Sequence, residues 1–180
     1  CECETDKLLR RRKKKDMSSR VVSLEIWLTE GKRNLAEFQR SPFHDTLRTE
    51  IRDHYTNLFE NFPKETLAKV EALLRAAKIE EPLSPSMSAS RTLEGCWELK
   101  THDKPKTVTV NGTTDYAYRF IPMVLNAELM GEREVVRHLC HNRACVCPDH
   151  LVIGSYQQNT QDEDERRYAG RDSKGRGQKA

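Results

Sequence analysis

Residues 138–150 constrain this chain more than any other segment. They read HLCHNRACVCPDH and contain three cysteines and three histidines. Cys140, Cys145 and His150 follow one another with four residues between each pair. Because thiolates and imidazoles are the ligands that zinc takes, this spacing predicts a metal site with three of its ligands in one loop.

A closed structural zinc site needs a fourth ligand. We expect Cys96 to supply it, because the short predicted strand CWELK opens the same small domain. Cys147 is the alternative, although it lies only two residues after Cys145 and directly before Pro148. Four protein ligands leave no open coordination position, so we expect the zinc to be structural rather than catalytic.

Metal binding is a better explanation of these cysteines than disulfide bonds. No apolar stretch follows the basic residues near the start, so we expect no signal peptide and an intracellular location, cytoplasmic or, in a eukaryote, nuclear. No apolar run is long enough to span a bilayer, so no membrane partner is expected. Only 36% of the residues are hydrophobic, and a small core of this kind benefits from a metal.

The first half of the chain is predicted to be a helical region over residues 21–80. It follows a basic disordered tail over residues 1–20, which contains RRRKKK, and precedes a linker rich in Pro and Ser over residues 81–92. We expect the helical region to serve as a packing or dimerising scaffold rather than to provide a DNA-reading helix. A possible homodimer is therefore one of the expected assemblies.

Apolar residues recur at steps of three and four between residues 43 and 62, which is the period of a helix. We expect this helix to begin near Ser41 and to end before Pro63, where a second helix starts. The preceding segment is less regular, and we expect it to be broken near Gly31.

Residues 93–168 show short β-type runs as well as helices, and a basic tail over residues 169–180 follows them. Asn111–Gly112 lies between two alternating runs, which is a strong hairpin signal. A short apolar helix is predicted to end at Gly131. Two strands, EVVRHL and HLVIGS, are predicted on either side of the Cys/His loop, and a polar helix capped by Ser155 follows them.

His138 and Asn159 are left over once the zinc ligands are assigned. His138 ends a predicted strand and Asn159 lies in the helix after the next strand, so the two side chains can face each other. An imidazole can take a proton from water near neutral pH. An amide oxygen suits Mg²⁺, which binds substrate phosphate, so the pair is compatible with phosphodiester hydrolysis.

The string HLCHNRACVCPDHLVIGSYQQNTQD resembles the zinc-bound branch of the His-Me finger (HNH-type) nucleases, which includes the His-Cys box homing endonucleases. The resemblance covers about residues 95–165. It implies an α+β fold in which an N-terminal helical region is followed by a zinc-stapled ββα nuclease domain.

The resemblance also implies the roles of individual residues. His138 is similar to the general base and Asn159 to the ligand of the catalytic Mg²⁺. Cys140, Cys145 and His150 match the zinc ligands of the family. GCWELK is similar to the upstream zinc cysteine of these enzymes, which supports Cys96 as well.

The chain departs from the family pattern in two places. Cys147 stands where many members have Asn before the proline. Some homing endonucleases have a phosphate-binding arginine in the hairpin, where this chain has Asp115. We expect Arg119 to replace it, with Arg137 as the alternative.

The resemblance implies a metal-dependent endonuclease that hydrolyses phosphodiester bonds in double-stranded DNA. The alternative is a non-catalytic zinc module that binds nucleic acid or protein, but this explains only the zinc ligands and gives no reason for His138 beside Asn159. A third interpretation makes residues 21–80 the functional part. The basic run RRRKKK can contact phosphates without sequence specificity, or can be a solvated tail or a localisation signal.

Overall fold

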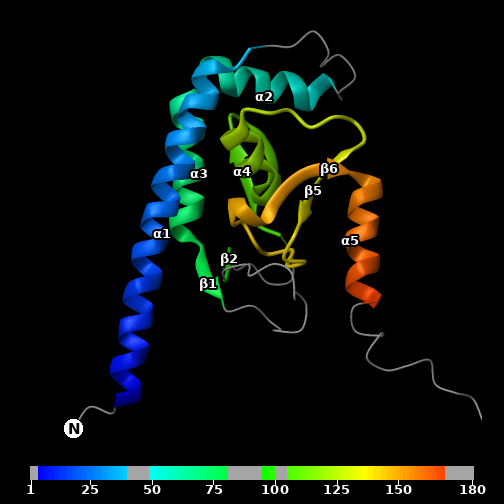
Figure 1. Cartoon of the computed structure of the whole chain (residues 1–180). Coiled ribbons are helices and arrows are strands. Elements are labelled where there is room, and N and C mark those ends of the chain that lie inside the picture. Colours follow the sequence, from blue (N-terminus) through cyan, green and yellow to red (C-terminus); the bar gives the residue numbers. More distant parts are fainter. Residues whose placement is uncertain (1–3, 40–48, 81–94, 100–104, 169–180) are drawn as a thin grey trace, which may run out of the picture.

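The computed structural model describes residues 4–39, 49–80, 95–99 and 105–168. Helices α1 and α3 lie side by side, α2 crosses near one end of them, and α4 is central (Figure 1). The mixture of helices with three two-stranded antiparallel sheets confirms the predicted α+β class. The elements in chain order are α1 (Glu4–Glu37), α2 (Thr49–Asn61), α3 (Pro63–Ala76), β1 (Lys78–Glu80), β2 (Cys96–Glu98), β3 (Thr107–Val110), β4 (Thr113–Tyr116), α4 (Ala117–Asn126), β5 (Glu134–His138), the 3₁₀ turn η3 (Pro148–His150), β6 (Leu151–Ser155) and α5 (Tyr156–Tyr168).

Helix α1 differs from the sequence-based expectation. It runs without a break from Glu4 to Glu37, where a disordered tail and a break near Gly31 were predicted. Gly31 is buried against α4, and a Cβ atom there would lie 2.8 Å from Cδ2 of Leu125. Close packing of this kind compensates for the poor helix propensity of glycine, and the Lys- and Arg-rich start can extend a helix that is already packed.

Helices α2 and α3 follow the predicted pattern. The chain turns at Phe62, and Pro63 occupies the start of α3, where its missing N–H removes no helical hydrogen bond. Tyr55, Leu58 and Phe59 of α2 are buried. The predicted start near Ser41 lies outside the described residues.

Strand β1 was not predicted, because residues 78–80 were assigned to the helical region. It pairs antiparallel with β2, and Glu80 lies opposite Cys96. The pairing connects the helical region directly to the Cys/His region. The predicted linker over residues 81–92 and the basic tail over residues 169–180 lie outside the described part of the chain.

The predicted hairpin is present as β3 and β4, which pair from Thr107–Tyr116 to Val110–Thr113 around the Asn111–Gly112 turn. Both turn residues have positive φ, 46° and 80°, as a type I′ turn requires. Helix α4 starts directly after β4 and ends at Asn126 rather than at the predicted Gly131. Ala127 ends the helix by adopting the left-handed conformation, with φ of 49°.

The helical region and the Cys/His region share one hydrophobic core. Its buried residues come from α1, α2, α3, α4, β2 and the loop before η3. Arg20 of α1 connects these parts, because its guanidinium lies 4.5 Å from the Trp97 ring centroid and donates to the carbonyl oxygens of Leu74 (2.6 Å) and Ala77 (2.7 Å). These carbonyls at the end of α3 have lost their helical partners, so Arg20 satisfies groups that would otherwise be costly to bury.

Candidate functional site

The four residues predicted as zinc ligands lie together. One possible ligand atom from each of Cys96, Cys140, Cys145 and His150 falls within 4.8 Å of all the others. Cys145 and His150 are fully enclosed, and Sγ of Cys145 lies 3.4 Å from Nδ1 of His150. Three thiols and an imidazole at this separation, shielded from water, fit a structural zinc site.

Backbone hydrogen bonds bring Cys96 to the loop despite the long sequence separation. Val146 N donates to the Trp97 carbonyl at 2.7 Å, and Leu99 N donates to the Ala144 carbonyl at 3.4 Å. Glu98 also forms an isolated antiparallel bridge with Cys145. Strand β2 is therefore held against the loop that carries the other cysteines.

Contacts within the cluster favour the ionised form of one cysteine, Cys96, and raise the pKa of another, Cys145. Hydrogen bonds from Cys140 and Cys145 lower the pKa of Cys96, so one sulfur of the cluster is readily present as a thiolate. Cys147, the alternative ligand, is buried but is not part of the cluster. Burial raises the pKa of Cys147 to about 12, so it remains a thiol at neutral pH.

His138 and Asn159 line one pocket beside the metal cluster. The pocket has a volume of ≈ 420 Å³ and is lined mainly by polar side chains of the hairpin, the Cys/His loop and α5. His138 is the last residue of β5 and pairs with Leu151, next to the zinc ligand His150. The structure thus brings the predicted base and the predicted Mg²⁺ ligand to a common cavity.

His138 is largely enclosed by its neighbours. Its Nε2 atom is buried without a hydrogen-bond partner among the described residues, and the Tyr118 ring centroid lies 4.9 Å from its own. Burial lowers the pKa of His138 to about 4, although a hydrogen bond with the Cys145 backbone acts in the opposite direction. The imidazole is therefore neutral at pH 7, which is the form that accepts a proton.

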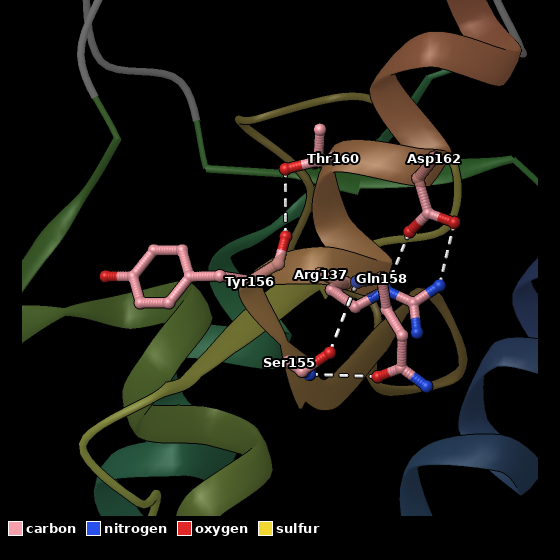
Figure 2. A network of polar contacts seen from close by, with 6 residues as sticks. All are labelled: Arg137, Ser155, Tyr156, Gln158, Thr160 and Asp162. Atoms are coloured by element: carbon pink, nitrogen blue, oxygen red, sulfur yellow. Dashed lines mark hydrogen bonds and ion pairs between the residues drawn. The ribbon is translucent and has the colours of Figure 1, made fainter.

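Strand β5, strand β6 and helix α5 are fixed to one another by polar contacts (Figure 2). Arg137 of β5 donates to both carboxylate oxygens of Asp162 in α5, each at 2.7 Å. Ser155 Oγ accepts from Gln158 N at 3.2 Å, and Gln158 Oε1 accepts from Ser155 N at 2.9 Å. This reciprocal capping box confirms the predicted cap and, with the Arg137 pair, sets the position of Asn159 on α5.

Gly154 allows this arrangement. A Cβ atom at Gly154 would lie 2.8 Å from Cδ of Arg137 and 2.7 Å from Oε1 of Gln158. Any side chain there would displace the capping glutamine, the arginine or both. The glycine in HLVIGS is thus explained by the close approach of Arg137 across the strand pair.

Residues 98–172 match the family of the zinc-binding loop region of homing endonucleases. Together with the Cys3His cluster, this match identifies the family of this region. This region is a zinc-binding domain of the His-Me finger endonuclease family. No curated protein and no solved structure matches the chain significantly. The family match begins after Cys96, so the fourth ligand of the His-Me finger domain is identified by the structure.

The arginines of the His-Me finger domain occupy different places. Arg119 lines a neighbouring pocket of ≈ 280 Å³ and pairs with Asp115 at 3.5 Å, so the structure does not bring it to His138 and Asn159. The alternative, Arg137, is paired with Asp162 and lines neither pocket.

Arg143 does line the pocket of the His-Me finger domain that holds His138 and Asn159, and sequence reasoning missed it. Tyr118 and His138 line the same pocket, so the positive charge of Arg143 lies on the side of the cavity that these two rings share. The sequence could have indicated Arg143, because it lies between Cys140 and Cys145 and metal ligation would fix so short a segment. His141 lines the same pocket.

Among the described residues, no helix is both long and apolar enough to cross a bilayer.

Proposed function

We propose that the chain is an endonuclease that hydrolyses phosphodiester bonds in double-stranded DNA, with His138 as general base and Asn159 as a ligand of a divalent cation. The observation that carries the proposal is that both residues line one pocket beside the Cys3His cluster. A zinc module that only binds nucleic acid needs no such pair.

His138 acts on the attacking water. We infer that one nitrogen of the neutral imidazole accepts the proton of the water, while the other ring nitrogen keeps its proton and donates to the Cys145 backbone. The water oxygen forms a bond to phosphorus while the bond between phosphorus and the 3′ oxygen breaks. The 3′ oxygen then takes up a proton from solvent, which leaves 5′-phosphate and 3′-hydroxyl ends.

Asn159 provides the amide oxygen for the cation. Glu163, one turn further along α5, lines the same pocket, so the oxygen atoms offered there are hard donors, as Mg²⁺ prefers. A Mg²⁺ ion held there would neutralise charge on the phosphate and stabilise the leaving oxygen. Asn159 is held in place by the cap and the Arg137–Asp162 pair at the two ends of its helical turn.

The pocket that contains His138 and Asn159 also bears on how many DNA strands one monomer cuts. One pocket of this kind acts on one phosphodiester bond, so we propose that a monomer nicks and that a homodimer is needed to cut both strands. Conversion of supercoiled plasmid to open circles at low protein concentration and to linear DNA at high concentration would support this.

Cleavage of supercoiled plasmid with Mg²⁺ tests the proposal. We expect His138→Ala and Asn159→Ala each to lower the cleavage rate by at least about 10²-fold while zinc content stays at the wild-type level. Gln161→Ala is the matched control, because Gln161 is an exposed residue of α5 that does not line the pocket.

Two outcomes would contradict the proposal. Wild-type protein that contains zinc, shifts DNA in a gel and leaves diverse DNA sequences intact with Mg²⁺ indicates the binding module instead. Wild-type rates in both pocket variants would exclude the assigned roles.

A further inference from the structure

The loop that contains the clustered cysteines also places a positively charged side chain, Arg143, in the proposed catalytic pocket. Arg143 is an exposed residue that lines this pocket together with His138 and Asn159. Within the described part of the chain no ion pair of Arg143 is found, whereas Arg119 is paired with Asp115. A guanidinium without a protein carboxylate is available for an anionic ligand.

The backbone that carries Arg143 is fixed on both sides. Asn142 accepts hydrogen bonds from Cys145 N at its carbonyl and from Ala144 N at its side-chain oxygen, each at 3.0 Å. Its side-chain amide donates to the carboxylate of Glu98 in β2. The turn is thus anchored to the strand that holds the zinc ligand Cys96.

The start of the turn is also constrained. His141 has a φ of 55°, and its N–H donates to the His138 carbonyl at 2.9 Å. Cys140 and Cys145, two of the four clustered ligands, bracket the segment. The base of the Arg143 side chain therefore has a defined position relative to His138, although its long arm points into solvent-accessible space.

We propose that Arg143 binds the non-bridging oxygens of the scissile phosphate and that the Asn142–Glu98 contact is its positioning device. This proposal rests on the proposed nuclease function and assigns the phosphate contact to the zinc loop. A guanidinium matches two phosphate oxygens with parallel hydrogen bonds and stabilises the added negative charge as the water attacks. Arg143 transfers no proton, since His138 takes the proton of the water.

The test measures single-turnover cleavage of a short DNA duplex as a function of protein concentration. We expect Arg143→Ala to lower the maximal rate by about 10²- to 10³-fold with a much smaller change in the half-saturating concentration. Arg143→Lys should recover part of the rate, because the charge remains but the bidentate geometry is lost. Arg133→Ala is the matched control, because Arg133 is an exposed arginine that lines neither pocket, and it should stay within about threefold of wild type.

Asn142→Ala separates positioning from direct contact. We expect it to lower the rate by about 10-fold with zinc retained, and to have little further effect in the Arg143→Ala background, because the two residues act as a unit. Independent, multiplicative losses in the double variant would overturn the positioning role.

The controls distinguish failure of this inference from failure of the proposed function. If the wild type cleaves and Arg143→Ala cleaves within twofold of it, the inference is wrong and the nuclease function stands. If Arg143→Ala and Arg143→Gln both lose zinc, the role is structural and the inference is also overturned. If the wild type itself does not cleave, both proposals fail.

Discussion

Helices α2 and α3 are stabilised mainly by apolar burial, whereas the loop between β5 and η3 buries few aliphatic side chains. In the helices, Leu58, Phe59, Val70 and Leu74 are almost completely enclosed. In the loop, the enclosed residues are Val146 and cysteines, and the position of the chain depends on ligands and backbone hydrogen bonds. A helical hairpin of this kind should thus tolerate the loss of one polar contact, while we expect the loop to depend on zinc at its Cys3His cluster.

The comparison predicts that a zinc ligand is the most costly residue to replace. Cys145→Ser should abolish stoichiometric zinc and unfold the loop, because structural zinc in small domains contributes on the order of 10 kcal/mol. Cys147→Ala is the matched control, since Cys147 is buried but lies outside the cluster. Metal analysis and thermal unfolding should show zinc loss in the first variant alone; zinc retention by Cys145→Ser would contradict the ligand assignment.

The next effect concerns the shared core. Phe59→Ala should lower the free energy of unfolding by about 3–5 kcal/mol, because it leaves a cavity among Tyr55, Phe38 and their neighbours. Phe62→Ala is the control, with 37% of the side chain already exposed, and should cost far less. Helical circular dichroism and the fluorescence of the packed Trp27 and Trp97 rings should report one common transition; two separate transitions would show that the regions fold independently.

A moderate effect is expected where α5 docks on β5. Asp162→Asn should cost about 1–3 kcal/mol, because both side chains of the Arg137–Asp162 pair are at least 80% shielded and the arginine loses its charged partner. Glu71→Gln in α3 is the comparison, since the Arg75–Glu71 pair is exposed and such pairs contribute about 0.5 kcal/mol or less. Urea unfolding of the two variants measures the difference, and equal losses would contradict the assigned role of burial.

The smallest effect is expected at the contact between α1 and the zinc region. Trp27 Nε1 donates to Asp149 at 3.1 Å, and the Trp27 ring packs edge-on against Trp97 with centroids 5.1 Å apart. Trp27→Phe removes the exposed hydrogen bond and keeps an aromatic ring, so it should cost about 0.5–1.5 kcal/mol. Asp149→Ala removes the same acceptor and is the matching variant. A loss above about 3 kcal/mol in both would show that α1 depends on this contact more than on apolar packing.

The sequence by itself determined the features that arise from neighbouring residues. The spacing of Cys140, Cys145 and His150 predicted ligands in one loop, and the Asn111–Gly112 turn predicted the hairpin. Ser155 predicted the start of α5, because capping depends on residues only three positions apart. Such interactions span a single turn, so local sequence is sufficient to specify them.

Only the tertiary structure decided the features that depend on distant partners. Helix α1 continues through Gly31 because Leu125 packs closely against this glycine. Strand β1 pairs with β2 although the two strands are far apart in the sequence. The pairing of the arginines was decided in the same way, because the fold places Asp115 beside Arg119 and Asp162 beside Arg137. A long side chain can reach several sites, and which one it occupies depends on where the fold places the carboxylates.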